Sequence, residues 1–187
     1  TTGIYNTIVG GAALDADTKG SKSVAIGTSA LSTQNFTTAT DVFNTAVGFE
    51  AGKAVTTSPK NTLIGGLAGD GITSGDGLNV AIGYNALGAG SNNTQENVAI
   101  GVDSLKTEDG HGRNTAVGHQ TLQTLNAGAL AYNTALGWKA GAAVTTGKEN
   151  TLMGASAGDV LTDADYNVGI GVGAIGSDTL GSRSTAL

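Results

Sequence analysis

A five-residue motif recurs along the entire chain, and this repeat constrains the fold more than any other feature. The motif reads Asn, then Thr or Val, then two small or apolar residues, then Gly. Ten complete copies begin at Asn6, Ser23, Asn44, Asn61, Asn79, Asn97, Asn114, Asn133, Asn150 and Asn167, and an eleventh starts at Ser184. Successive copies are 17, 21, 17, 18, 18, 17, 19, 17, 17 and 17 residues apart. Such regular spacing indicates a stack of equivalent structural units.

A longer repeat is superimposed on the short one. Residues 44–70 match residues 133–159 at an offset of 89, so a block of five units is approximately duplicated. No linker rich in Pro, Gly or Ser and no run of charges interrupts the array. We therefore expect residues 1–187 to form a single repeat domain.

The unit is too short for repeats built from helix pairs or propeller blades, which need about 33 residues or more. The Thr, Val and Ile of the motif favour a short strand. With 31 Gly and only 4% aromatic residues, the chain suits a narrow cross-section with little room for large side chains. The sequence predicts an all-β fold, a β-solenoid (parallel β-roll) of about ten coils of 17–19 residues stacked about 4.8 Å apart.

Stacking places equivalent residues of successive coils in columns. We expect the second and fourth motif positions to point into the coil and the third to point outward. Gly at the fifth position supplies a bend that a Cβ would obstruct. The side-chain amides of the first position are expected to form a ladder that satisfies backbone groups at the bend. This structural ladder comprises Asn6, Asn44, Asn61, Asn79, Asn97, Asn114, Asn133, Asn150 and Asn167.

The third motif position contains no polar residue. It holds Ile8, Ala25, Ala46, Leu63, Ala81, Ala99, Ala116, Ala135, Leu152 and Gly169. If these side chains point outward, they form an apolar stripe along the whole rod, which is a large exposed patch for a single chain. We therefore expect the chain to bury the stripe against copies of itself, and we favour a homotrimer around a three-fold axis.

Aromatic residues also follow the repeat. Phe49, Tyr84 and Trp138 each come directly after the Gly of a motif, and His119 occupies the same place. They can fill gaps between chains, since aromatic side chains are chiefly a packing resource. They can also form a surface row of ligand contacts that stacks on sugar rings, but we favour the packing role.

Several phrases resemble known families. SVAIG at 23–27 and NVAIG at 79–83 and 97–101 resemble the head repeats of trimeric autotransporter adhesins. NTAVGFEAG at 44–52 and NTALGWKAG at 133–141 are more similar to the repeat of bacteriophage tail-fibre and related virion-fibre proteins. The resemblance covers essentially the whole chain. It implies a trimeric β-roll that attaches to surfaces, located outside the cell on a virion fibre or a bacterial surface.

Other kinds of site are disfavoured by composition. The net charge of −6, without a Lys or Arg cluster, argues against nucleic acid as a partner. No apolar run is long enough for membrane insertion. Zero Cys excludes thiolate metal sites and Cys nucleophiles. The repeat itself generates the GASAG at 154–158, which fits a nucleophile elbow, and the GVGAIG at 171–176, which fits a dinucleotide loop. We predict no enzyme, no cofactor and no metal site.

Three classes of function are left. The leading hypothesis is a structural and adhesive fibre segment of a phage virion or bacterial surface appendage, whose loops attach to a host glycan or protein. The alternative is an ice-binding β-solenoid, because short coils with Asn, Thr and Val also build such proteins. An ice-binding face needs a regular outward column of Thr, however, and we expect the second position to point inward. The third is a glycan-cleaving fibre enzyme, for which no pair of carboxylates stands out.

Overall fold

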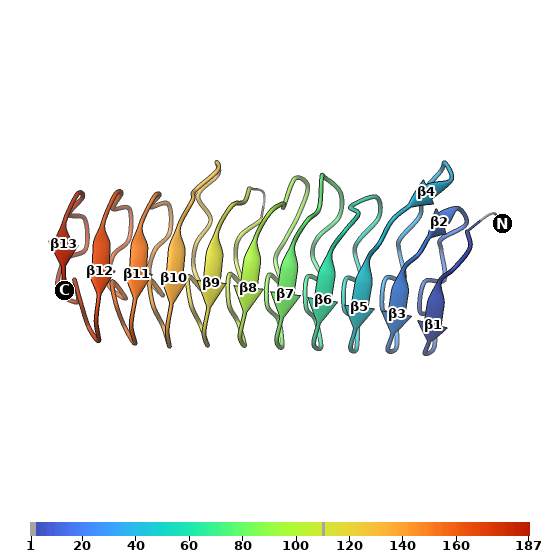
Figure 1. The fold of residues 1–187 in the computed structure, drawn as a ribbon, viewed down its shortest axis with the longest axis horizontal. Helices are drawn as coiled ribbons and strands as arrows, with labels where there is room; N and C mark the ends of the chain where they lie inside the picture. Colours follow the sequence, from blue (N-terminus) through green and yellow to red (C-terminus); the bar gives the residue numbers. More distant parts are fainter. Residues whose placement is uncertain (1–2, 110) are drawn as a thin grey trace.

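The computed structural model describes residues 3–109 and 111–187, which form a rod of stacked coils with the two termini at opposite ends (Figure 1). Each coil contributes one short strand to an eleven-stranded parallel sheet, and the strands follow one another in chain order. They are β1 (Thr7–Val9), β3 (Val24–Ile26), β5 (Thr45–Val47), β6 (Thr62–Ile64), β7 (Val80–Ile82), β8 (Val98–Ile100), β9 (Thr115–Val117), β10 (Thr134–Leu136), β11 (Thr151–Met153), β12 (Val168–Ile170) and β13 (Thr185–Ala186). A separate two-stranded sheet pairs β2 (Gly20–Ser21) with β4 (Thr40–Asp41). No described residue is helical, and the prediction of an all-β solenoid is confirmed.

The motif sets the register between coils. Thr134 pairs with Thr115 of the preceding coil and with Thr151 of the following one, and the other strands align in the same way. The turn side of the coil is stacked as regularly as the strand side. There the backbone N–H of Leu122 donates to the carbonyl of Ala140 over 3.0 Å, and equivalent bonds recur along the rod. Columns of equivalent residues therefore run around the whole cross-section.

The structure reverses the predicted facing of the strand residues. Third-position residues point into the coil, and those from Ala25 to Leu152 are fully buried. The second and fourth positions are half-buried or exposed, with Leu136 at 44% and Ile170 at 41% exposure. The prediction that positions two and four face inward and position three outward is therefore wrong. Strand side chains alternate, so the buried Asn of the first position forces the third position inward as well. An error of one residue moves every side chain to the opposite face.

The core is filled by side chains of complementary size at the third and ninth positions, counted from the first residue of each motif. Where the third position carries Leu, the ninth position of that coil is Gly. Leu63 at a third position fills the space beside two ninth-position glycines. A Cβ added to Gly52 would lie 2.6 Å from Leu63 Cδ1, and one added to Gly69 would lie 2.7 Å from Leu63 Cδ2. Leu152 repeats this arrangement 89 residues later in the duplicated block. The interior is thus narrow but filled.

The glycines of the fifth position make the bend that closes each strand. Gly137 has a φ of 139°, which L-residues avoid, and an added Cβ would lie 2.5 Å from the carbonyl oxygen of Gly154 in the next coil. Both the backbone conformation and the close approach of stacked coils therefore require Gly here.

Candidate functional site

The first-position Asn side chains form a buried ladder that holds successive coils together. Asn133 Oδ1 accepts hydrogen bonds from the backbone N–H (2.9 Å) and the Nδ2 (3.1 Å) of Asn150 in the next coil. Asn150 Nδ2 also donates to the carbonyl of Ala164 over 2.8 Å. Each amide thus satisfies backbone groups that the bend leaves without a partner in the sheet. These residues have a structural role and are not accessible to a ligand.

Gln34 completes the ladder where Ser23 replaces Asn. Its buried side chain accepts a hydrogen bond from Asn44 Nδ2 (2.8 Å) through Oε1, and its Nε2 donates to Ser23 Oγ (3.3 Å) and Asp17 Oδ2 (2.5 Å). The missing amide is therefore supplied from another part of the same coil. This coil is also the longest, with 21 residues.

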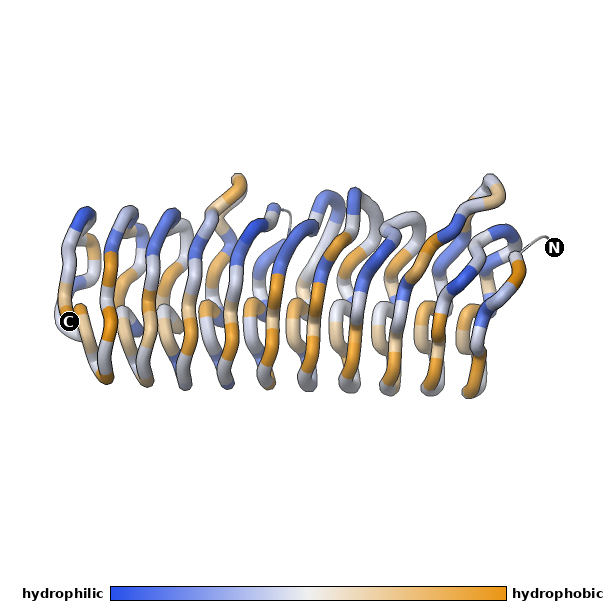
Figure 2. Tube along the Cα trace, in the orientation of Figure 1, coloured by the Kyte–Doolittle hydropathy of each residue, from blue (hydrophilic) through white to orange (hydrophobic). Residues whose placement is uncertain are grey.

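The outward side of the sheet forms a continuous surface along the rod. We call it the outer sheet face and define it as the first and last residues of every three-residue strand. The first column holds only Thr or Val, the last holds only Val, Ile, Leu or Met, and neither contains a charge. Figure 2 shows the same apolar band recurring from coil to coil, with polar turns beside it. From the strand spacing and rise, this face measures on the order of 500 Å².

One edge of the outer sheet face carries the aromatic residues considered above as ligand contacts. Phe49, Tyr84 and Trp138 are 57%, 55% and 52% exposed, and His119 is exposed in the same column. Gly66 separates Phe49 from Tyr84, whereas His119 and Trp138 lie on neighbouring coils. The structure therefore places all four side chains along one edge but does not join them into a continuous aromatic surface.

The opposite edge, formed by the residue before each motif, combines aromatic and charged side chains. Arg113 Nε pairs with Glu96 Oε2 at 2.8 Å, and its Nη1 donates to Tyr132 Oη over 2.9 Å. The hydrogen bonds with Glu96 and Tyr132 raise the pKa of the Arg113 guanidinium above its usual value. Lys22 Nζ lies 5.2 Å from the centroid of the Phe43 ring, an exposed cation–π contact. This edge forms a polar rim.

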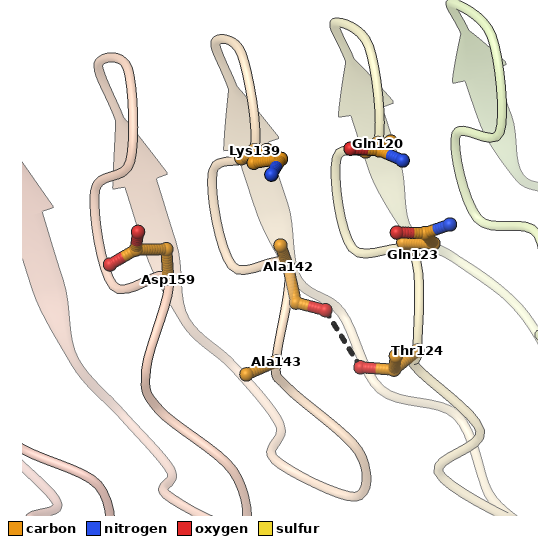
Figure 3. Close-up of a pocket in the computed structure, with 7 residues that line it drawn as sticks. All are labelled: Gln120, Gln123, Thr124, Lys139, Ala142, Ala143 and Asp159. Atoms are coloured by element: carbon orange, nitrogen blue, oxygen red, sulfur yellow. Dashed lines mark hydrogen bonds between the residues drawn. The ribbon is translucent and has the colours of Figure 1, made fainter.

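An open pocket of about 400 Å³ lies on the turn side of the coils (Figure 3). Three successive coils provide its lining, which consists of Gln120, Gln123, Thr124, Lys139, Ala142, Ala143 and Asp159. Thr124 Oγ1 donates to the carbonyl of Ala142 over 2.7 Å and fixes one wall. Lys139 Nζ lies 4.8 Å from the centroid of the Trp138 ring. The lining combines one cation, one carboxylate and two carboxamides around two methyl groups.

Residues 3–109 and 111–187 contain no group of three or more His, Asp or Glu side chains placed to hold a metal ion. The same ranges contain no helix long and apolar enough to cross a membrane. Ser156 of the GASAG phrase is half-buried at a turn position of the repeat.

The fold defines a class of protein, the β-solenoid tandem-repeat proteins. No protein-family model, curated protein or solved structure matches the chain. The outer sheet face, its two edges and the pocket are therefore the features that bear on function.

Sequence reasoning missed Gln34 and the pocket. Gln34 could have been found by asking what replaces the amide at Ser23, the only complete motif copy without Asn. The pocket could have been found by comparing the duplicated blocks position by position, because Lys53 of the first block becomes Ala142 in the second.

Proposed function

We propose that the chain is a segment of a structural and adhesive fibre, on a virion or a bacterial surface, in which three copies associate in parallel. The observation that supports this proposal is the uncharged outer sheet face, which runs along the whole rod. Aliphatic side chains along this face stay well exposed in the single chain, with Leu136 at 44% and Ile170 at 41%, and exposed apolar surface of this kind marks an interaction site.

Because the third position points inward, the second and fourth positions form the proposed interface instead. The fourth position is apolar in every three-residue strand, with Ile64 and Met153 38% and 37% exposed in the single chain, and the second position adds a column of Thr and Val beside it. The aromatic edge with Phe49, Tyr84 and Trp138 adds further contact area.

The two edges are suited to parallel association around an axis along the rod. Such an axis brings the aromatic edge of one chain against the opposite edge of its neighbour, where cations and rings alternate. Lys60 at that edge can then lie over an aromatic ring of the neighbouring chain, whereas Lys22 and Arg183 lie over Phe43 and Tyr166 of their own chain. The resemblance of the repeats to trimeric adhesin heads and virion fibres supports three chains and an extracellular location. The longer turns, which project beside the rod at β4 and between β9 and β10 (Figure 1), are available for attachment.

Sedimentation equilibrium of the whole chain tests the assembly. Three chains of 18.3 kDa correspond to a particle of about 55 kDa, which we expect at micromolar concentration. Ile82→Lys places a charge in the middle of the outer sheet face and should shift the particle towards the monomer. Ala89→Lys adds the same charge at an exposed turn of the same coil and should leave the trimer intact. A monomeric wild-type chain, or equal behaviour of both variants, would contradict the proposal.

An ice-binding surface is a second candidate because the structure places the second motif position outward. Thr115, Thr134 and Thr151 occupy three neighbouring strands in register. Val at the second position of β3, β7, β8 and β12 interrupts the Thr column, and the aliphatic column beside it suits a protein partner better than ice. A clear thermal-hysteresis signal that Thr134→Leu reduces would reverse this order.

We do not propose glycan cleavage. The pocket is lined by one carboxylate, Asp159, whereas glycoside hydrolysis uses a pair of carboxyl groups.

A further inference from the structure

We propose that the pocket lined by Gln120, Gln123, Lys139 and Asp159 binds a neutral hexopyranose unit of a surface glycan. This inference adds a ligand to the adhesive role proposed above and rests on it for its biological meaning. The binding itself does not require self-association, because one chain supplies all the lining residues.

The duplicated blocks show that the pocket is a local modification of a shared frame. The coil that begins at Ser23 precedes the first block as the coil that begins at Asn114 precedes the second, and we include each with the block it precedes. Thr33 and Thr124 hold the same position in these two coils, since Thr33 Oγ1 donates to the carbonyl of Lys53 (2.5 Å) as Thr124 Oγ1 does to that of Ala142 (2.7 Å). Asp70 of the first block likewise corresponds to Asp159. The backbone and two of the polar positions are therefore equivalent in the two blocks.

Four lining positions differ between the blocks. Counted from the first residue of the motif, the seventh position is Ser29 before the first block and Gln120 before the second. The tenth position is Ser32 before the first block and Gln123 before the second. In the following coil these two positions are Glu50 and Lys53 in the first block, where Lys53 Nζ pairs with Glu50 Oε1 at 3.0 Å.

The second block replaces that ion pair by Lys139 and Ala142. The small Ala142 leaves open the space that a long side chain occupies in the first block. Within residues 3–109 and 111–187, Lys139 makes no ion pair like that of Lys53, and its ammonium group lies over the neutral Trp138 ring instead. The backbone and the Thr hydrogen bonds are the same at the two places, whereas the side chains that line the pocket differ. Such a local change of lining on a shared backbone is expected of a binding site.

The chemistry of the lining matches a sugar ring. Each carboxamide of Gln120 and Gln123 offers both donors and an acceptor, Lys139 donates and Asp159 accepts. Neighbouring hydroxyl groups of a pyranose need this mixture, because each hydroxyl both donates and accepts. Ala142 and Ala143 add apolar methyl groups to the lining, against which the C–H groups of the ring can pack. A volume of about 400 Å³ lies at the small end of ligand pockets and accommodates one ring of an extended saccharide.

The charges of the pocket favour a neutral ligand over an anionic one. Lys139 and Asp159 both line the pocket, so the formal charges of the lining add up to zero. A phosphate, sulfate or sialic acid group would meet a carboxylate as well as an ammonium group. The Trp138 ring holds the Lys139 ammonium at the rim, beside the aromatic edge of the outer sheet face.

A glycan array tests the site. The fluorescently labelled whole chain is applied to printed neutral oligosaccharides of hexoses and N-acetylhexosamines, with sialylated and sulfated oligosaccharides on the same slide. Neutral oligosaccharides that bind are then titrated by calorimetry against three variants. Ala142→Lys restores the long side chain of the first block, Gln123→Ser restores its small polar residue, and Lys53→Ala is the matched control in the first block.

We expect the wild-type chain to bind at least one neutral oligosaccharide. Ala142→Lys should weaken the affinity at least tenfold and Gln123→Ser at least threefold, whereas Lys53→Ala should leave it within twofold. Binding to anionic glycans alone, binding to none, or equal affinity of wild type and Ala142→Lys would each overturn the inference. Sedimentation of every sample separates this result from the proposed assembly. A trimer that binds no neutral glycan refutes only the site, and a monomer that binds one refutes only the assembly.

Discussion

Leu63→Ala removes the side chain that fills the core beside two glycines. Leu63 is fully buried, and its methyl groups occupy the space next to Gly52 and Gly69. Leu→Ala substitutions in cores cost about 2–5 kcal/mol, and the cost depends on how far the surroundings collapse. Glycine has no side chain to move into the gap, and hydrogen bonds hold the coils on both sides. We therefore expect a loss of about 4 kcal/mol, near the top of that range.

A second substitution tests whether the volume exchange is the cause. Gly69→Leu alone should destabilise the chain by about 2 kcal/mol, because the new side chain meets Leu63 and Ile72. The double variant Leu63→Ala, Gly69→Leu has Ala at the third position and Leu at the ninth. The natural coil that begins at Asn114 has the same combination, with Ala116 and Leu122 both fully buried. Leu122 has a φ of 48°, so the ninth position accepts Leu despite its left-handed backbone.

The measurement is urea unfolding followed by far-ultraviolet circular dichroism, with all variants at one protein concentration because association adds to apparent stability. We expect the double variant to be more stable than the sum of the single changes by about 2 kcal/mol or more. Additive effects, within about 0.5 kcal/mol, would show that the two positions do not share a space and would refute the reasoning.

Three further predictions concern the ladder, the bend and one carboxyl group. Gln34→Ala should lower the unfolding free energy by about 1–3 kcal/mol, and Ser23→Asn in the same chain should restore much of it; urea unfolding that shows no rescue would contradict the role of Gln34. Gly137→Ala should cost about 3 kcal/mol through strain and backbone contact, whereas Gly128→Ala, at a φ of 62° with no atom within 4 Å of the added Cβ, should cost about 1 kcal/mol. Desolvation raises the pKa of Asp70 above its usual value of 3.8, so the folded state binds the proton more tightly and this group favours folding more as pH falls towards 3.8. Asp70→Asn should therefore stabilise the chain more at pH 7 than at pH 3.5, and thermal unfolding at the two pH values that shows the opposite order would refute the assignment.

The sequence determined the architecture of the chain because nearly every coil carries the same residue types at the same motif positions. The motif spacing, the Asn of the first position and the Gly of the fifth predicted a parallel solenoid, and the structure has one strand per motif in register. A stack of near-identical coils leaves few alternatives once the spacing is known, since a shifted register would break the Asn, Gly and apolar columns together.

The tertiary structure decided which way the strand residues face. Three-residue strands with apolar or neutral side chains at every position carry no alternation of polar and apolar residues from which to assign the inner face. The assignment depends on contacts across the coil, above all the size match of Leu63 with Gly52 and Gly69. These residues are close only when the coil is closed.

The candidate sites divide in the same way. The aromatic positions at Phe49, Tyr84 and Trp138 are visible in the sequence because each follows a bend Gly. The pocket exists only because stacking brings residues of three coils side by side, so no single stretch of sequence reveals it. Local repetition thus determined the path of the backbone, whereas packing between coils decided what is buried, what is exposed and where a ligand can enter.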